Sequence, residues 1–456
     1  RGHLAQASLV QAPHQTTEEP RWVLSDWLGL ASVMRFVIFT ICCIVAAASP
    51  LRIVGRHRSW PDGHVDFDHP GVKIVSRVTG AASVSAVMSK VGSIENVFVV
   101  YCDGVAQAGS RPKATFSTKL WTDGTKQSVP LCSGLDTNAE HDIVIFKSTE
   151  AQWMGIKPTP NHVSFYEMVG LGMRLLPPLV RPQQHRIEFL GDSLTAGFCN
   201  LCEQEHSPAA ESFALSWPNL VCEQLEAECH AAAWSGYGMV KNCCGGDTLM
   251  SDVWLRTLAS TPSDDASDPH GTTADNIWNF TSWIPDAVVI NLGSNDGLTG
   301  SREELIPAYN ATYLDLVKSA VVAYGEHTHF FLACGPMSNA YCDAVLWIIR
   351  QAQAVGIKAT FLDHRGFRNP ARCCGHPGAD EDRQMAVSTV KQIKAAIPES
   401  EQVTPQPTPF KQGNVRIQFA FPVQGLVRCA SAVTILLAAL GLLGWSLGCL
   451  RPLKSG

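Results

Sequence analysis

Four short motifs contain the residue types that nucleophilic catalysis requires. Along the chain they are Gly191–Leu194 (Gly-Asp-Ser-Leu), Ser235–Gly238 (Ser-Gly-Tyr-Gly), Gly293–Asp296 (Gly-Ser-Asn-Asp) and Gly375–Pro377 (Gly-His-Pro). A serine hydroxyl is a poor nucleophile at neutral pH until a base takes its proton. Imidazole suits that role because it titrates near neutral pH. We therefore expect Ser193 to be a nucleophile and His376 to be its base.

Three hydrogen-bond donors in these motifs are expected to stabilise the negative charge on a carbonyl oxygen under attack. They are the backbone amide of Ser193, the backbone amide of Gly238 and the side-chain amide of Asn295. One such donor is typically worth about 3 kcal/mol of the activation barrier. Glycine at position 238 would let the backbone approach the reacting atoms closely. Gly236 is the alternative donor if the loop is aligned one step differently.

Three residues close to the motifs are predicted to bind the substrate. They are Asp192, Trp234 and Trp283. A tryptophan ring can stack on a sugar, although packing in a core is the commoner fate of that side chain.

The elements that must position these residues follow an α/β pattern. Short apolar segments predict strands, and each of the first three ends at a motif; the five are 186–190, 228–233, 287–292, 329–333 and 359–362. Between and after them, apolar residues at helical spacing predict helices over 313–324 and 386–397. Buried strands that alternate with amphipathic helices form a parallel sheet covered on both faces. We therefore expect a three-layer α/β/α catalytic domain over residues 185–398, with the site at the carboxyl ends of the strands.

Residues 51–180 show a different pattern. Short β-branched and aromatic runs, such as 72–78, 97–101 and 142–147, are separated by Gly, Pro, Asp and Asn. Such regular spacing of strands and turns is typical of an all-β sandwich. The α/β region is therefore predicted to be preceded by a β-sandwich of the jelly-roll kind.

The order Ser, Gly, Asn, His resembles that of the SGNH (GDSL-type) hydrolases. The longer segments 186–193, 235–238, 289–296 and 375–377 are similar to carbohydrate esterase family 2, whose members are acetyl esterases acting on xylan and related glycans. Segments 54–56, 100–104 and 141–150 resemble landmarks of that family's N-terminal β-sandwich. The resemblance covers residues 51–398. It implies a serine esterase that removes O-acetyl groups from polysaccharide without a metal or an organic cofactor.

One position departs from the SGNH pattern. Most of these enzymes carry the triad aspartate three residues before the histidine, and here that residue is Cys373. Family 2 members can orient the histidine through a backbone carbonyl or a different acid. The alternative acids in this chain are Asp363, Asp380 and Glu381.

Two further features concern the histidine. His364, at the end of a predicted strand, is a rival base, although it lacks the Gly-His-Pro setting of His376. Cys373 and Cys374 are expected to form disulfides that pin the loop carrying His376.

Both ends of the chain carry apolar segments. A charged start, a short apolar core and small residues predict a signal peptide at 34–48. Residues 430–450 contain no charged side chain and predict a transmembrane helix, with a glycosylphosphatidylinositol signal as the alternative. A proline-rich linker over 399–428 precedes it. We therefore expect a single-pass membrane protein of the secretory pathway with a lumenal or extracellular catalytic domain.

Composition agrees with that location. The chain has 16 cysteines in 456 residues, and 12 remain once Cys42, Cys43, Cys429 and Cys449 in or beside the apolar segments are set aside. An even number in a secreted chain predicts several disulfides. Asn279 and Asn310 begin glycosylation sequons. The net charge of -6 and the lack of a basic stripe argue against a nucleic-acid partner.

Two other functions remain open at this point. One is a lipase or phospholipase that acts on the membrane holding it. The other is a catalytically inactive surface protein that binds glycans, which the missing aspartate motivates. The expected partner in the leading interpretation is an acetylated carbohydrate, and the oligomeric state is not indicated.

Overall fold

The computed structural model describes residues 50–397, apart from residues 110–113, 153–156, 178, 180–184, 203–206, 263–271, 299–301 and 368–372. All of the described residues belong to one compact unit. The predicted signal peptide (34–48), linker (399–428) and transmembrane helix (430–450) lie outside them. Within the described part of the chain, no helix combines the length and apolar character needed to span a bilayer.

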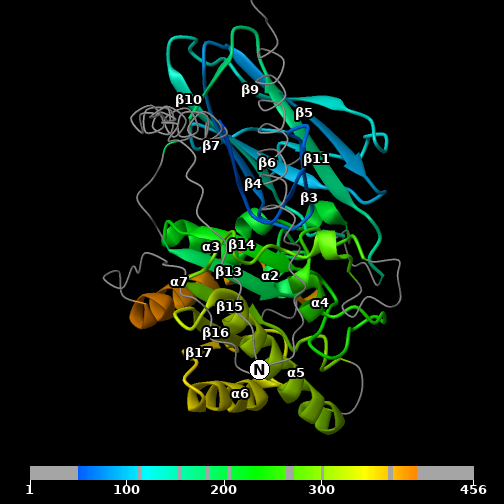
Figure 1. Cartoon of the computed structure of the whole chain (residues 1–456), viewed down its shortest axis with the longest axis vertical. Helices are drawn as coiled ribbons and strands as arrows, with labels where there is room; N and C mark the ends of the chain where they lie inside the picture. Colours follow the sequence, from blue (N-terminus) through cyan, green and yellow to red (C-terminus); the bar gives the residue numbers. More distant parts are fainter. Residues whose placement is uncertain are drawn as a thin grey trace, which may run out of the picture. The chain divides into compact units, whose positions relative to one another are not determined.

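The first part of the described chain is a sandwich of two antiparallel sheets, coloured from blue to blue-green in Figure 1. One sheet has the order β1 (Leu51–Val54), β4 (Lys73–Thr79), β10 (Glu140–Lys147), β6 (Val97–Cys102) and β7 (Val105–Ala106), with β12 (Arg174–Leu176) beside β4 and β8 (Phe116–Ser117) beside β6. The other has the order β2 (Arg58–Ser59), β3 (Val65–Phe67), β11 (His162–Val169), β5 (Ser83–Val91) and β9 (Gln127–Ser133). The strands expected from the β-branched runs correspond to β4, β6 and β10.

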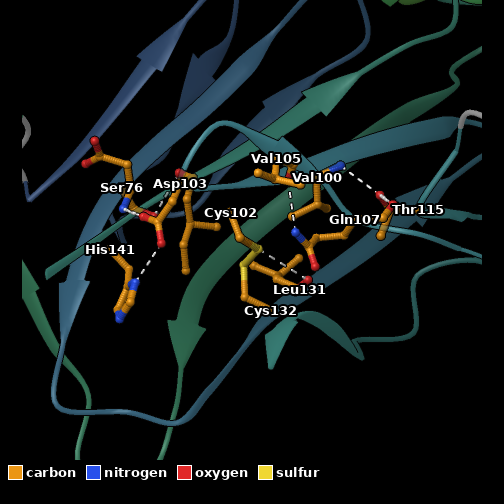
Figure 2. The surroundings of a disulfide bond; sticks show 12 residues. Ser76, Val100, Cys102, Asp103, Val105, Gln107, Thr115, Leu131, Cys132 and His141 are labelled. Carbon is orange, nitrogen blue, oxygen red and sulfur yellow. Dashed lines mark hydrogen bonds and ion pairs between the residues drawn. A yellow bond between two sulfur atoms is a disulfide. The ribbon is translucent and has the colours of Figure 1, made fainter. Parts of the chain in front are cut away.

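The sandwich core follows from alternation along the strands. In β5, Val84, Ala86 and Met88 point into the core, since side chains two residues apart lie on the same face of a strand. A disulfide between Cys102 at the end of β6 and Cys132 in β9 joins the two sheets, as Figure 2 shows. The core is therefore closed both by apolar packing and by a covalent link.

The second part is a five-stranded sheet in which every pairing is parallel. Its order is β14 (Glu228–Ala233), β13 (Arg186–Gly191), β15 (Ala287–Asn291), β16 (His329–Cys334) and β17 (Ala359–Asp363), and Figure 1 shows these strands following one another in that order. The predicted strands are all present, with bounds that differ by one residue at most.

Helices cover both faces of this sheet. On one face Leu190 and its neighbours pack with α4 (Met250–Leu255), α5 (Arg302–Tyr324) and α6 (Cys342–Ala354). On the other face Phe189 and its neighbours pack with α3 (Trp217–Gln224) and α7 (Ala379–Ala396). Adjacent residues of β13 thus face opposite layers, which is why its sequence is apolar throughout. The expected three-layer architecture is present.

The strand order places the site. The chain begins in β13, moves to β14 on one side, and then crosses to β15 on the other. Loops that leave the carboxyl ends of β13 and β15 therefore diverge. Ser193 follows β13 and Asn295 follows β15, so both lie at this switch point in the strand order.

A buried ion pair joins the sandwich to the parallel sheet. Arg56, two residues after β1, donates from Nη2 to Glu188 Oε1 of β13 at 2.7 Å, and both side chains are fully buried. Glu188 Oε2 also accepts from Trp254 Nε1 at 3.0 Å and from the Tyr324 hydroxyl at 2.8 Å. Because the buried carboxylate has several donors, the pair fixes the strand that presents Ser193.

Removing one partner of this pair is expected to destabilise the fold strongly. Arg56→Met would leave the Glu188 carboxylate buried without its cation, at a cost of about 3–5 kcal/mol. The double variant Arg56→Met/Glu188→Met removes both charges and should recover most of that loss. Urea unfolding of the three proteins measures this, and a loss below about 1 kcal/mol for Arg56→Met would contradict it.

Candidate active site

Ser193 is presented by a sharp turn between β13 and α2 (Ser193–Ala196). Asp192 caps this short helix, and its Oδ1 accepts from the Leu194 amide at 3.0 Å. A Cβ atom at Gly191 would lie 2.0 Å from Thr195 Oγ1, so the turn closes only around a glycine. Ser193 is therefore held at the carboxyl end of the central strand with its side chain 6% exposed.

The structure brings His376 onto this serine. His376 Nε2 lies 2.9 Å from Ser193 Oγ, although the two residues are 183 positions apart in sequence. The other ring nitrogen, Nδ1, lies 3.1 Å from the carbonyl oxygen of Cys374. The Phe198 ring packs against the imidazole at a centroid distance of 4.9 Å. This is the geometry that a base needs to take a proton from a hydroxyl.

The resemblance allowed a backbone carbonyl or a different acid as the group that orients the histidine. In the structure, the carbonyl of Cys374 is the group beside Nδ1. The alternative acids make other contacts. Asp363 pairs with Arg365, Asp380 pairs with Arg383, and Glu381 Oε2 accepts from the Gly378 amide at 2.9 Å. Because that carbonyl accepts a hydrogen bond from Nδ1–H, Nε2 is left as the acceptor that faces Ser193.

The rival base, His364, is a core residue. Its side chain is fully buried, its Nε2 lies 3.0 Å from Thr389 Oγ1, and its ring meets Trp217 edge to face. Burial lowers the pKa of His364 to about 4, so it stays neutral. It packs the sheet against α7 and does not reach Ser193.

Six disulfides pair the twelve cysteines between residues 102 and 374. They are Cys102–Cys132, Cys199–Cys374, Cys202–Cys373, Cys222–Cys229, Cys243–Cys244 and Cys334–Cys342. The expected pinning of the histidine loop is present, because Cys373 and Cys374 are each bonded to the segment that follows α2.

The expectation for Gly238 needs correction. Its amide donates to Asn242 Oδ1 at 2.9 Å, and a Cβ atom there would lie 2.0 Å from the Lys241 carbonyl oxygen. The glycine is therefore required for a tight loop, and its amide is already used. Within the part of the chain that the structure describes, the amides of Gly236 and Ser193 make no hydrogen bond. Gly236 is also the more exposed of the two glycines.

Asn295 contacts both the turn after β13 and the loop that contains Tyr237. Its Nδ2 donates to the Tyr237 carbonyl at 2.7 Å and to Asp192 Oδ2 at 3.2 Å. Both amide hydrogens therefore have acceptors here. Of the two contacts, the longer one, to Asp192, is the weaker.

Two carboxylates that the motif analysis did not single out hold the 235–241 loop. Asp296 accepts from the amides of Met239, Val240 and Lys241 at 2.7–3.0 Å. Glu150, just beyond β10 of the sandwich, accepts from the Ser235 amide. The position of Asp296 in its motif signals such a role, whereas only the folded chain brings Glu150 to this loop.

The three predicted substrate contacts are not borne out. Asp192 is fully buried and both of its oxygens accept from protein groups; burial, with the nearby Asp296 and Glu150, raises its pKa to about 7. Trp234 is fully buried against Tyr237. Trp283 precedes β15, so it lies at the amino end of the sheet, where its Nε1 donates to Glu228 at 2.7 Å. All three are structural in this conformation.

A buried polar cluster behind the serine was also missed. Asn200 Nδ2 donates to the Ser212 carbonyl and to Asp382 Oδ2, and Asn200 Oδ1 accepts from the Ser212 amide, all within 3.0 Å. Asp382 lies in the first turn of α7, close in sequence to His376. Burial raises the pKa of Asp382 to about 8. No motif signals these residues, because they become neighbours only through the fold.

No protein-family model matches the chain. The cellulase/esterase CelE of Acetivibrio thermocellus is 30% identical over 252 residues, which are 53% of this chain and 26% of that protein. An acetylxylan esterase/glucomannan deacetylase of Cellvibrio japonicus is 24% identical over 362 residues, 77% of this chain and 90% of the relative. The structure of a family two carbohydrate esterase from Clostridium thermocellum, in complex with cellohexaose, is 25% identical, with a TM-score of 0.62 over 76% of this chain and 98% of that one.

The chain is thus similar to esterases, among them an acetylxylan esterase and a family two carbohydrate esterase. The match to the solved neighbour covers 76% of this chain, enough to include both the sandwich and the parallel sheet. The chain spans only about a quarter of CelE, so that similarity concerns one part of a longer protein. Among the described residues, no group of three or more His, Cys, Asp or Glu side chains is arranged to hold a metal ion.

The buried Asp382 predicts a pH dependence of stability. Its pKa is about 8 in the folded chain, while an aspartate in an unfolded chain titrates near 3.9. Between these values the folded state keeps a proton that the unfolded state has released. The contribution of Asp382 to the free energy of unfolding therefore falls as pH rises from about 4 to about 8.

Asp382→Asn is expected to remove this contribution, so the variant should lose less stability than the wild type between about pH 5 and pH 8. Urea unfolding across this range measures the slope. Asp380→Asn, an exposed aspartate of the same helical turn, is the matched control and should keep the wild-type slope. Parallel pH profiles for Asp382→Asn and the wild type would rule out the raised pKa.

Proposed function

We propose that this chain is a serine esterase that removes O-acetyl groups from polysaccharide, with Ser193 as nucleophile and His376 as base. The observation that carries the proposal is the 2.9 Å contact between His376 Nε2 and Ser193 Oγ at the carboxyl end of β13. Similarity to an acetylxylan esterase and to a family two carbohydrate esterase supports the same chemistry.

The steps follow from the geometry. Ser193 Oγ attacks the ester carbonyl while its proton passes to His376 Nε2. The tetrahedral intermediate collapses as the imidazolium returns that proton to the departing sugar hydroxyl, which leaves an acyl-serine. Water activated by His376 then releases the acid. Throughout, the Cys374 carbonyl accepts from Nδ1–H and keeps Nε2 directed at the serine.

The oxyanion is stabilised, on this proposal, by the amides of Ser193 and Gly236 and by Asn295. Gly236 takes the place expected for Gly238, because the Gly238 amide donates within its own loop. Asn295 would keep its 2.7 Å bond to Tyr237 and exchange its longer contact with Asp192 for the oxyanion. The amides of Ser193 and Gly236 are fixed by the backbone, so these two donors need little reorganisation during the reaction.

The proposed substrate is an acetylated carbohydrate. One relative is named an acetylxylan esterase/glucomannan deacetylase, and a family two neighbour was solved with cellohexaose bound. A lipase would require long acyl chains to react faster than acetate. A glycan-binding protein without activity would bind such polymers and leave the ester intact.

We also propose that the enzyme works in the secretory pathway or outside the cell, anchored by residues 430–450. Six disulfides support an oxidising compartment. Asn279 of the first sequon is exposed, as glycosylation would require.

Substitution of the nucleophile is the direct test. Ser193→Ala should lower kcat for p-nitrophenyl acetate by at least about 10³-fold, since no hydroxyl remains to form the acyl-enzyme. Circular dichroism of the variant checks that it is folded. Acetate release from acetylated xylan, compared with hydrolysis of long-chain esters, decides between a deacetylase and a lipase. Equal rates for Ser193→Ala and the wild type would disprove the nucleophile assignment.

Asn295→Ala should reduce kcat by roughly 10²–10³-fold while KM changes little, because an oxyanion donor acts in the transition state. Asn242→Ala is the companion variant: Asn242 supports the same loop through the Gly238 amide but offers no oxyanion donor. It should lose much less activity. Similar kcat losses in both variants would mean that Asn295 acts only by holding the loop.

A further inference from the structure

We propose that two disulfides, Cys199–Cys374 and Cys202–Cys373, together form the positioning element of the catalytic histidine. We call this pair the clasp. The inference rests on the proposed function, because it concerns how His376 is held for its reaction with Ser193. We infer that the clasp increases the rate of the chemical step, in addition to any stability that it gives to the fold.

The first disulfide, Cys199–Cys374, covalently connects the segment that follows Ser193 with the segment that precedes His376. Cys199 follows Ser193 by six residues, in the turn directly after α2. Cys374 precedes His376 by two residues, and its carbonyl oxygen lies 3.1 Å from His376 Nδ1. One residue therefore both ends the covalent link from the nucleophile's loop and contacts the base. A shift of Cys374 would move the acceptor and the imidazole together.

The second disulfide removes the freedom that one link leaves. A single disulfide lets two segments rotate about it. Cys202–Cys373 joins the same two segments again, with the bonded cysteines adjacent on one side and three residues apart on the other. Two links between the same segments fix their relative orientation as well as their distance.

The backbone at the clasp shows that it is held. All four cysteines have left-handed backbone conformations, with φ of 55° at Cys199, 57° at Cys202, 58° at Cys373 and 56° at Cys374. For residues other than glycine such a conformation costs of order 1 kcal/mol or more and persists only when the surroundings impose it. Without the disulfides these residues would gain by returning to ordinary φ values, and the Cys374 carbonyl would turn away.

Non-covalent contacts nearby distinguish positioning from folding. The Ala379 amide donates to the Asn200 carbonyl at 3.0 Å, and Asn200 Nδ2 donates to Asp382. These bonds hold the start of α7 beside the nucleophile's loop without any help from sulfur. Loss of the clasp should therefore loosen the histidine loop while α7 stays in place.

The test uses paired substitutions in the full chain. The double variants Cys199→Ala/Cys374→Ala and Cys202→Ala/Cys373→Ala each open one link and remove no backbone carbonyl group. The controls open other disulfides: Cys222→Ala/Cys229→Ala in the α/β region and Cys102→Ala/Cys132→Ala in the sandwich. Thermal unfolding of each protein measures the loss of stability separately from the loss of activity.

Each clasp variant should lose kcat on p-nitrophenyl acetate by up to about 10²-fold, because a displacement of about 1 Å at a reacting group has an effect of that size. KM should change little, and the acidic limb of the pH profile of kcat/KM should shift. The control variants should keep kcat even where they unfold at a lower temperature. Clasp variants with wild-type kcat, or controls with equal losses of kcat, would overturn the proposal.

A readout that needs no turnover separates this inference from the proposed function. In protein labelled with ¹⁵N-histidine, the His376 ring resonance is the one missing from His376→Gln. It should keep its wild-type position in both control variants and move in both clasp variants. An inactive wild type with this pattern would disprove the esterase and keep the clasp. An active wild type whose His376 resonance is unchanged in the clasp variants would do the reverse.

Discussion

The hydrogen bond between His376 Nε2 and Ser193 Oγ is the interaction on which the rest of this structure depends. It joins residues 183 positions apart, so it depends on the fold that brings the start and the end of the α/β part together. The sheet supplies the serine at its topological switch point, where the loops after β13 and β15 diverge. The histidine lies on the short segment before α7. The position of Ser193 is fixed by the end of a buried strand, whereas the position of His376 is fixed only by the loop that carries it.

The sandwich takes part in this arrangement through buried charge. Arg56 fixes Glu188 in the strand that ends at the nucleophile, and Glu150 accepts from the Ser235 amide at the start of the glycine loop. Both contacts are buried, so each is shielded from competition with water. The sandwich therefore holds both the strand that ends before Ser193 and the start of the loop at Ser235.

Periodicity and turn residues predicted the architecture well. The apolar segments before Ser193 and Asn295 predicted buried strands, and the apolar spacing over 313–324 placed the end of α5 correctly. Residue types at a strand end and just before a helix predicted Ser193 and His376, since chemistry restricts those positions to few side chains. Prediction failed where the role of a side chain depends on the residues that the fold places next to it. Trp283 has the residue type of a sugar platform, but it lies at the amino end of its strand, and its neighbour in space is Glu228.

The same limit explains the error at Gly238. The Ser-Gly-Tyr-Gly motif offers two glycine amides, and sequence cannot say that Asn242, four residues on, accepts from one of them. The disulfide partners of Cys373 and Cys374 could not be predicted either, because pairing depends on distances that only the fold sets.

Buried carboxylates show how the site is organised. Asp192, Asp296 and Glu150 each accept from backbone amides, so acidic side chains here fix loops, while a backbone carbonyl contacts the imidazole. A carbonyl has no net charge and fixes orientation only if the backbone that carries it is itself fixed. The need for a rigid mount at Cys374 therefore follows from the choice of a carbonyl as the histidine's neighbour.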